Sequence, residues 1–219
     1  MMTVILSSPE SEPVHNIANS RNCPVMRWSK GLSRIADYRG MFRCRLFCLL
    51  ILFPLNALAA QTWVLVNTER GTVTVHRASR TVLQLKGAAI GRGGVTHVHV
   101  RGDGSTPLGT FRIVRINHRS RFHVFFELNY PTTTQARLGY QRGLINHHTL
   151  RKIEQATAVG QLPPQNTVLG GDIGIHGLGK GSLWVHRHFN WTDGCVALTN
   201  LQIEKLARWL EIGTRVVIK

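Results

Sequence analysis

Short β-branched runs separated by turn residues fill the chain from Thr62 onward. The first two, TWVLVN and TVTVH, flank a turn at Glu69-Arg70-Gly71. Further runs of this kind cover residues 81–85, 96–100, 109–116, 122–128 and 214–219. Such runs at intervals of roughly ten residues, with turns between them, are typical of sandwiches and barrels. The sequence therefore predicts a mainly β domain of sandwich-like or barrel-like form.

Two helical stretches interrupt this pattern. After Tyr130-Pro131, apolar residues at helical spacing predict a helix over 133–143 and a second from Asn146 or His147 to about Ala158. A C-terminal helix is predicted to begin at Thr199 or Asn200 and to close at Gly213. Its expected apolar face consists of Leu201, Ile203, Leu206, Trp209 and Leu210. The fold class is thus mainly β, with a small helical insertion and a C-terminal helix.

Residues 41–60 have the layout of a secretory signal peptide. Arg43 and Arg45 precede an apolar run over 46–55, and Ala57-Leu58-Ala59 supplies a cleavage pattern of small residues. The alternative is a buried core helix, since the run is short for a membrane span. Residues 1–40 lack periodicity and are predicted to be disordered, or a non-native extension before a true start at Met41. The expected mature domain, residues 61–219, is exported to the periplasm or cell envelope and keeps no membrane span.

Removal of the signal peptide on export would reduce the number of cysteines, of which the full chain has four. Cys23, Cys44 and Cys48 precede the cleavage site, so the mature domain retains Cys195 alone. An exported domain with one cysteine has no internal disulfide partner. Its thiol is therefore either an inert buried group or a reactive one.

The chain is strongly basic, with 27 Lys and Arg against 11 Asp and Glu and a net charge of +16. Such a charge attracts an anionic partner: nucleic acid, an anionic membrane face or the polymers of a bacterial envelope. The arginines are spread over strands, without the basic helix or aromatic platforms of nucleic-acid binding. Together with export, this favours envelope polymers and predicts no nucleic-acid partner.

The segment 173–200, IGIHGLGKGSLWVHRHFNWTDGCVALTN, contains the residues best suited to catalysis. A free thiol is mostly protonated at neutral pH, so Cys195 needs a base, which His176 can provide. Gly194 permits close backbone approach to a substrate. The N–H groups around Gly194 and Cys195 are candidates to bind a tetrahedral oxyanion.

Several motifs make the chain similar to the murein L,D-transpeptidase catalytic domain family. His176-Gly177 followed by Thr192-Asp193-Gly194-Cys195 resembles the family's signature, His-Gly and then Ser/Thr-x-Gly-Cys. Further similarity lies in Gly102-Asp103 with 106–111, in 120–123, in 129–131 and in Gly213-Thr214, so that it spans most of residues 62–219. The family often has Arg or Asn two residues after the cysteine and His or Arg before Gly-Cys. Ala197 and Asp193 occupy those positions here.

This resemblance implies a cysteine enzyme that acts on peptidoglycan stem peptides without a cofactor. Cys195 is the implied nucleophile, His176 the general base and acid, Gly194 a backbone oxyanion donor, and the Gly177 carbonyl the group that orients the imidazole. Residues expected to contact substrate are Thr192, Asp193, Trp191, His186, Tyr130 and His123. The acceptor is left open: an amine of a second stem peptide or of a wall-anchored protein, or water. An L,D-carboxypeptidase, an amidase on wall–protein links and a non-catalytic wall-binding module remain alternatives.

Two other patterns are weaker. GIHGLGKG (174–181) approaches a phosphate-binding loop but lacks Ser or Thr after Lys180, and residues 183–185 do not resemble a helix start. The pairs His97/His99 and His186/His188 have the spacing of neighbours on one strand face, which metal sites also use. No carboxylate or cysteine in a metal-binding pattern accompanies them. The sequence therefore predicts a solvated basic face and no metal.

Overall fold

The structure is a computed structural model that describes residues 61–219. The predicted signal peptide (41–60) and the residues before it (1–40) lie outside the described residues. Within the described part, no helix combines the length and the apolar character needed to cross a membrane.

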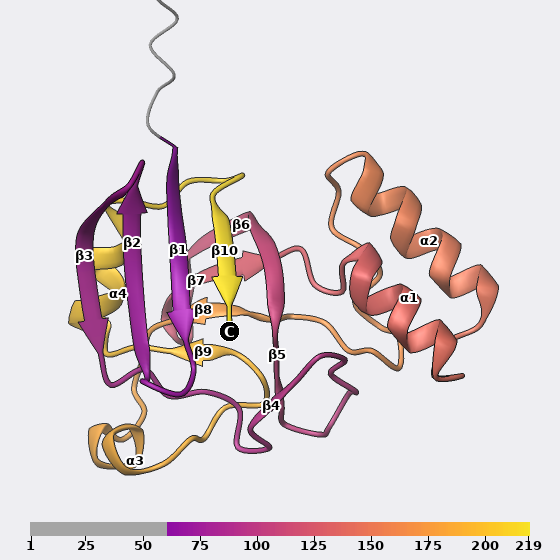
Figure 1. Cartoon of the computed structure of the whole chain (residues 1–219). Coiled ribbons are helices and arrows are strands. Elements are labelled where there is room, and N and C mark those ends of the chain that lie inside the picture. Colours follow the sequence, from indigo (N-terminus) through magenta and orange to yellow (C-terminus); the bar gives the residue numbers. More distant parts are fainter. Residues whose placement is uncertain (1–60) are drawn as a thin grey trace, which may run out of the picture. The chain divides into compact units, whose positions relative to one another are not determined.

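A mixed sheet of eight strands organises the fold and confirms its mainly β character (Figure 1). Across the sheet the order is β3 (Arg80–Lys86), β2 (Thr72–Arg77), β1 (Thr62–Asn67), β10 (Arg215–Ile218), β6 (Gly109–Ser120), β7 (His123–Leu128), β8 (Gly174–His176) and β9 (Val196–Ala197). Alternating valines explain the first hairpin, because Val64, Val66, Val73 and Val75 are all fully buried. A separate parallel pair joins β4 (Val95–Thr96) to β5 (Thr106–Pro107).

The edge of the sheet formed by β7, β8 and β9 positions the catalytic segment. β8 pairs antiparallel with β7 and parallel with β9. In this register His176 lies opposite Phe125 on one side and Ala197 on the other. The histidine on β8 and the turn that leads into β9 with Cys195 are thereby brought together, although 18 residues lie between His176 and Cys195 in the chain.

The helical insertion forms a pair of helices with a small core of its own (Figure 1). It comprises α1 (Thr133–Gln141) and α2 (His147–Ala158), and Asn146 caps α2 by accepting the Thr149 N–H at 2.9 Å. Both predicted helices are confirmed. The first helix, α1, ends two residues earlier than expected. Ala136, Leu150, Ile153 and Leu169 are buried between them and the loop that follows.

The C-terminal helix α4 (Asn200–Ala207) begins as predicted, with Thr199 as its N-cap. Thr199 and Gln202 bond reciprocally in a capping box, and Ile203 and Leu206 are fully buried in the main core. The predicted end was wrong, because Arg208 is already the C-cap, residues 208–209 form a turn and Leu210 lies outside the helix. Leu201 does not belong to the apolar face; it is 63% exposed.

Two further expectations were wrong. The predicted strand over 96–100 is reduced to the two residues of β4, because the buried ring of His99 bonds to Ser105 and Asp103 and bends the chain. Residues 183–185, which were not expected to begin a helix, are the first residues of the short helix α3 (Leu183–His188). The hydroxyl of Ser182 caps this helix by accepting the Val185 N–H.

Candidate active site

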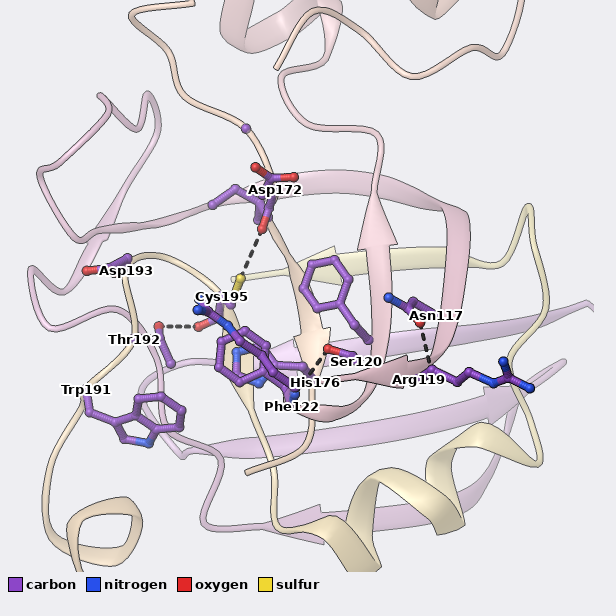
Figure 2. Close-up of a pocket in the computed structure, with 14 residues that line it drawn as sticks. Asn117, Arg119, Ser120, Phe122, Asp172, His176, Trp191, Thr192, Asp193 and Cys195 are labelled. Carbon is purple, nitrogen blue, oxygen red and sulfur yellow. Dashed lines mark hydrogen bonds between the residues drawn. The ribbon is translucent and has the colours of Figure 1, made fainter. Parts of the chain in front are cut away.

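A cavity of about 790 Å³ opens beside β8 (Figure 2). Its walls are the end of β6 with the β6–β7 turn (residues 117–122), Phe125 of β7, the segment before β8 (171–173), His176 and the turn 191–195. The predicted nucleophile and the predicted base both line this cavity. Cys195 is the one cysteine of the described residues and is free and partly buried.

The thiol of Cys195 points to the main chain of Asp172 (Figure 2). Its Sγ donates to the Asp172 carbonyl oxygen at 3.2 Å. Burial raises the pKa of Cys195 to about 12, and the charges of Asp172, Asp193 and Glu127 add to this effect. At neutral pH the nucleophile is therefore a thiol that must lose its proton during the reaction.

The imidazole of His176 is held in one tautomer. Its Nδ1 lies 2.7 Å from the Gly177 carbonyl oxygen, and because a carbonyl only accepts, the proton must be on Nδ1. Nε2 then carries the lone pair that a general base needs. Burial, aided by the charges of His186 and Arg121, lowers the pKa of His176 to about 4. The ring is consequently neutral and able to accept a proton at pH 7.

Aromatic side chains fix the plane of this ring. Phe122 stacks on His176 with 4.2 Å between ring centroids, and Trp191 meets the imidazole edge-on at 5.8 Å. The indole Nε1–H of Trp191 donates to His186 Nδ1 at 3.3 Å. This hydrogen bond from Trp191 to the buried His186 holds the indole in place against His176.

The turn that carries the nucleophile is closed by Thr192. The Thr192 hydroxyl donates to the Cys195 carbonyl oxygen at 2.6 Å and accepts the Gly194 N–H at 3.2 Å. The Gly194 N–H is therefore engaged within the turn, whereas the sequence had assigned it to an oxyanion. What the turn requires of Gly194 is its backbone conformation, with φ at +126°.

Replacement of Gly194 by alanine is expected to damage both stability and activity. An added Cβ would lie 2.7 Å from the Ser105 carbonyl oxygen and 2.9 Å from Ile173 Cδ1, at a φ that disfavours side chains. Strain and overpacking of this kind cost on the order of 2–4 kcal/mol together. Displacement of Cys195 should also lower kcat/KM roughly 100-fold.

Gly143→Ala is the matched control for this substitution. Gly143 also has a positive φ, +70°, but an added Cβ there meets no atom within 4 Å. Urea unfolding should show a loss of only about 1 kcal/mol for this control, from backbone strain alone. Equal losses for the two variants would show that the close packing at Gly194 is unimportant.

Three of the residues expected to contact substrate lie at the cavity: Trp191, Thr192 and Asp193. The Thr192 hydroxyl is committed to the turn, as described above. The Asp193 carboxylate is largely exposed and forms an ion pair with Arg92. Of these three cavity residues, Trp191 and Asp193 are therefore the ones that can contact a substrate through their side chains.

The other three residues do not line the cavity, which corrects the prediction for each. Tyr130 is fully buried, and its hydroxyl donates to the His99 carbonyl at 3.0 Å. His186 is only 4% exposed and faces Trp191. His123 pairs with Glu204 of α4 at 2.7 Å and is not among the residues that line the cavity. In each case the side chain is engaged in packing or pairing away from the site.

Two cavity residues were not anticipated from the sequence. Asp172 has a positive φ of 54°, and the Gln165 side chain accepts its N–H at 2.6 Å, which turns its carbonyl toward Cys195. Arg121 comes from the β6–β7 turn, distant in sequence from both catalytic candidates. The one sequence signal for Asp172 is the Gly170-Gly171 pair just before it, which marks an unusual backbone.

The histidine pairs do not form a solvated face. His99 and His186 are buried, so this expectation was wrong for both. His99 Nδ1 bonds to the Ser105 carbonyl oxygen at 2.8 Å and supports the loop beneath Gly194. Among residues 61–219, no group of three or more His, Cys, Asp or Glu side chains is arranged to hold a metal ion.

The low pKa of His176 predicts a specific loss of stability in acid. The unfolded chain protonates this ring near pH 6.5, whereas the folded protein resists protonation down to about pH 4. The contribution is therefore complete above pH 6.5 and declines as the pH falls toward 4, by about 3 kcal/mol at most. Urea unfolding of the protein and of His176→Asn at pH 7 and pH 4.5 measures it. The variant should lose less stability than the native chain, and equal losses would contradict the assignment.

The comparisons with known proteins agree with this geometry. The family model of the YkuD L,D-transpeptidase catalytic domain matches residues 61–218. No curated protein matches the chain by sequence.

Among solved structures, the helical cell shape determining protein Pgp2 of Campylobacter jejuni is similar, with 21% identity and a TM-score of 0.48 over 73% of this chain and 47% of that one. Bd1075 of Bdellovibrio bacteriovorus has 18% identity and a TM-score of 0.47 over 74% of this chain and 49% of that one. An L,D-transpeptidase of Xylanimonas cellulosilytica has 16% identity and a TM-score of 0.43, over 74% and 61%. The chain spans about half the length of the first two. On the family match over residues 61–218, the chain belongs to the YkuD L,D-transpeptidase catalytic domain family.

Proposed function

We propose that the protein is a peptidoglycan L,D-transpeptidase that acts through a thioester at Cys195. The observation that carries this proposal is the meeting of Cys195 and a tautomerically fixed, neutral His176 in one cavity. A neutral thiol beside a neutral imidazole suits general-base attack, in which the proton moves as the substrate carbonyl is engaged. A resting thiolate is not required.

In the first step, Cys195 Sγ attacks the carbonyl carbon that joins an L-configured centre to a D-amino acid. The thiol proton passes to His176 Nε2, and the tetrahedral oxyanion is bound by backbone N–H groups, for which the Cys195 N–H is the main candidate. The C–N bond then breaks, and His176 returns the proton to the leaving amine. The product is a thioester at Cys195 and a free D-amino acid.

In the second step, an acceptor amine attacks the thioester carbon. His176 Nε2 takes a proton from the amine, and the thiolate of Cys195 leaves and recovers that proton. We propose that the acceptor is an amine of a second stem peptide, or of a wall-anchored protein, and that the reaction serves wall biogenesis or remodelling. Water in the same position would give an L,D-carboxypeptidase.

Mass spectrometry of muropeptides incubated with the purified protein tests this function. Dimers linked between two third-position residues are the expected product, and shortened monomers alone would establish carboxypeptidase action instead. Release of wall-bound protein would indicate the amidase alternative. If no muropeptide changes, and a carbapenem forms no adduct with Cys195, the enzyme assignment is wrong and a non-catalytic wall-binding module remains.

We also propose that the enzyme acts in the cell envelope after removal of residues 41–60. The support is the signal-peptide pattern in the sequence together with the family's substrate. N-terminal sequencing of the protein recovered from its native cells should give a mature chain that begins at Gln61. A mature chain that begins well before Gln61 would contradict export by this route.

A further inference from the structure

The β6–β7 turn places positive charge on one wall of the cavity. Arg119 and Arg121 both line it, but the Arg119 side chain extends away from Cys195 (Figure 2). Arg121 instead lies over the ring of Phe122, with its guanidinium carbon 4.7 Å from the ring centroid. Within residues 61–219, the Arg121 guanidinium takes part in none of the ion pairs. It is therefore a cation at the catalytic cavity that is available to a ligand.

Two stacked contacts connect this cation to the base. Arg121 lies on Phe122, and Phe122 lies on the His176 ring at 4.2 Å. The opposite side of the cavity carries the carboxylates of Asp172 and Asp193, both of which raise the pKa of Cys195, although Asp193 is paired with Arg92. The cavity is thus electrically asymmetric, with positive charge beside the base and negative charge beside the nucleophile.

The chemistry of the leaving group fits this asymmetry. A general acid must come within hydrogen-bond reach of the nitrogen that it protonates. If the expelled group is a single terminal amino acid, its carboxylate carbon lies only roughly 2.5 Å from that nitrogen. The carboxylate must therefore lie on the His176 side of the cavity, which is the side of Arg121. A guanidinium recognises a carboxylate through paired, charge-assisted hydrogen bonds.

We propose that Arg121 binds the terminal carboxylate of the leaving amino acid and thereby restricts donors to peptides whose scissile bond is the last one. This inference rests on the proposed function and assigns its donor specificity to one residue. Ala197 offers no charge next to the nucleophile, and the cation at the cavity that is free of ion pairs comes from the β6–β7 turn.

Two donor peptides that differ only at the C-terminus, carboxylate against carboxamide, test the proposal on the whole chain. The native enzyme should favour the carboxylate in kcat/KM by roughly 10- to 100-fold. Arg121→Met should remove this preference by slowing the carboxylate peptide alone, since the Met side chain still covers Phe122. Arg121→Lys should restore part of it. Arg208→Met, at the exposed end of α4, is the charge-matched control and should behave as the native enzyme.

Equal losses on both peptides for Arg121→Met, or a native enzyme indifferent to the carboxylate, would overturn the proposal. A binding experiment separates this failure from failure of the proposed function. In a Cys195→Ser background, which cannot form a thioester, the carboxylate peptide should bind more tightly than the amide, and Arg121→Met should abolish the difference. If the preference in binding is present but no thioester forms in the native enzyme, Arg121 is correctly assigned and the catalytic proposal is wrong. If the preference in binding is absent, the Arg121 assignment is wrong whatever the turnover.

Discussion

Cys195→Ser is expected to lower acylation of the protein by at least about 1,000-fold while the fold is retained, since a hydroxyl is a far weaker nucleophile than a thiol. Serine is close to cysteine in size, and its hydroxyl can donate to the Asp172 carbonyl as the thiol does. Stability should therefore change by less than about 1 kcal/mol. Intact-protein mass spectrometry after exposure to a carbapenem measures the adduct, and urea unfolding measures the stability.

Cys195→Ala serves as the second variant, because it removes the nucleophile without leaving a hydroxyl. Neither variant should gain a carbapenem adduct or transform muropeptides. If the alanine variant kept its activity on muropeptides, another residue would be the nucleophile. If it kept only wall binding and the native protein showed no activity, the non-catalytic reading would be supported.

His176→Asn is expected to lower kcat/KM by roughly 100- to 10,000-fold, the usual range for removal of a general base. An Asn amide can still donate to the Gly177 carbonyl, so the local hydrogen bond can be retained. The pH dependence then separates loss of a base from misplacement of the nucleophile. With the pKa of Cys195 near 12, the thiolate fraction without a base rises about tenfold per pH unit.

Acylation of His176→Asn should therefore accelerate about tenfold per pH unit between pH 7 and pH 10. Acylation of the native enzyme should be nearly flat over this range, because neutral His176 supplies the base throughout. A flat profile for the variant would mean that the substitution displaced Cys195. A steep profile for the native enzyme would mean that His176 does not accept the thiol proton.

The sequence predicted the sheet better than the loops, for a physical reason. In β1 the buried Val64 and Val66 alternate with less buried residues, β2 repeats the valine spacing at Val73 and Val75, and that pattern is local. The N-caps Asn146 and Thr199 were local signals too, and both helix starts are confirmed. The end of α4 was missed because Trp209 and Leu210 continue the apolar pattern beyond the C-cap Arg208.

The errors lie where a side chain overrides the local pattern. Residues 96–100 alternate like a strand, yet the buried ring of His99 bonds to Asp103 and Ser105 in the turn that follows, and the strand ends at Thr96. Tyr130 belongs to a motif of the resemblance, but its hydroxyl is used inside the fold. Burial of this kind depends on tertiary contacts that no short window of sequence contains.

The site shows the same difference between residues that a local motif identifies and residues that only tertiary contacts bring to the cavity. His176 and Cys195 were found through a motif, and the structure brings them to one cavity. Asp172 accepts the hydrogen bond of the Cys195 thiol, and Arg121 adds a cation to the cavity, but the two residues come from separate loops. The positive φ at Asp172 is hinted at only by the Gly170-Gly171 pair before it, and the stacking of Arg121 upon Phe122 has no sequence signature.

The central claim is that Cys195 carries an acyl group during turnover. The direct measurement is acid quenching of the protein with a stem tetrapeptide, followed by peptide mapping in the mass spectrometer and assay of the released amino acid. We expect an adduct on Cys195 equal to the donor peptide without its terminal residue, in step with release of that residue, and no adduct in Cys195→Ala. Release of the terminal residue by the alanine variant, or an adduct on any other side chain, would contradict it.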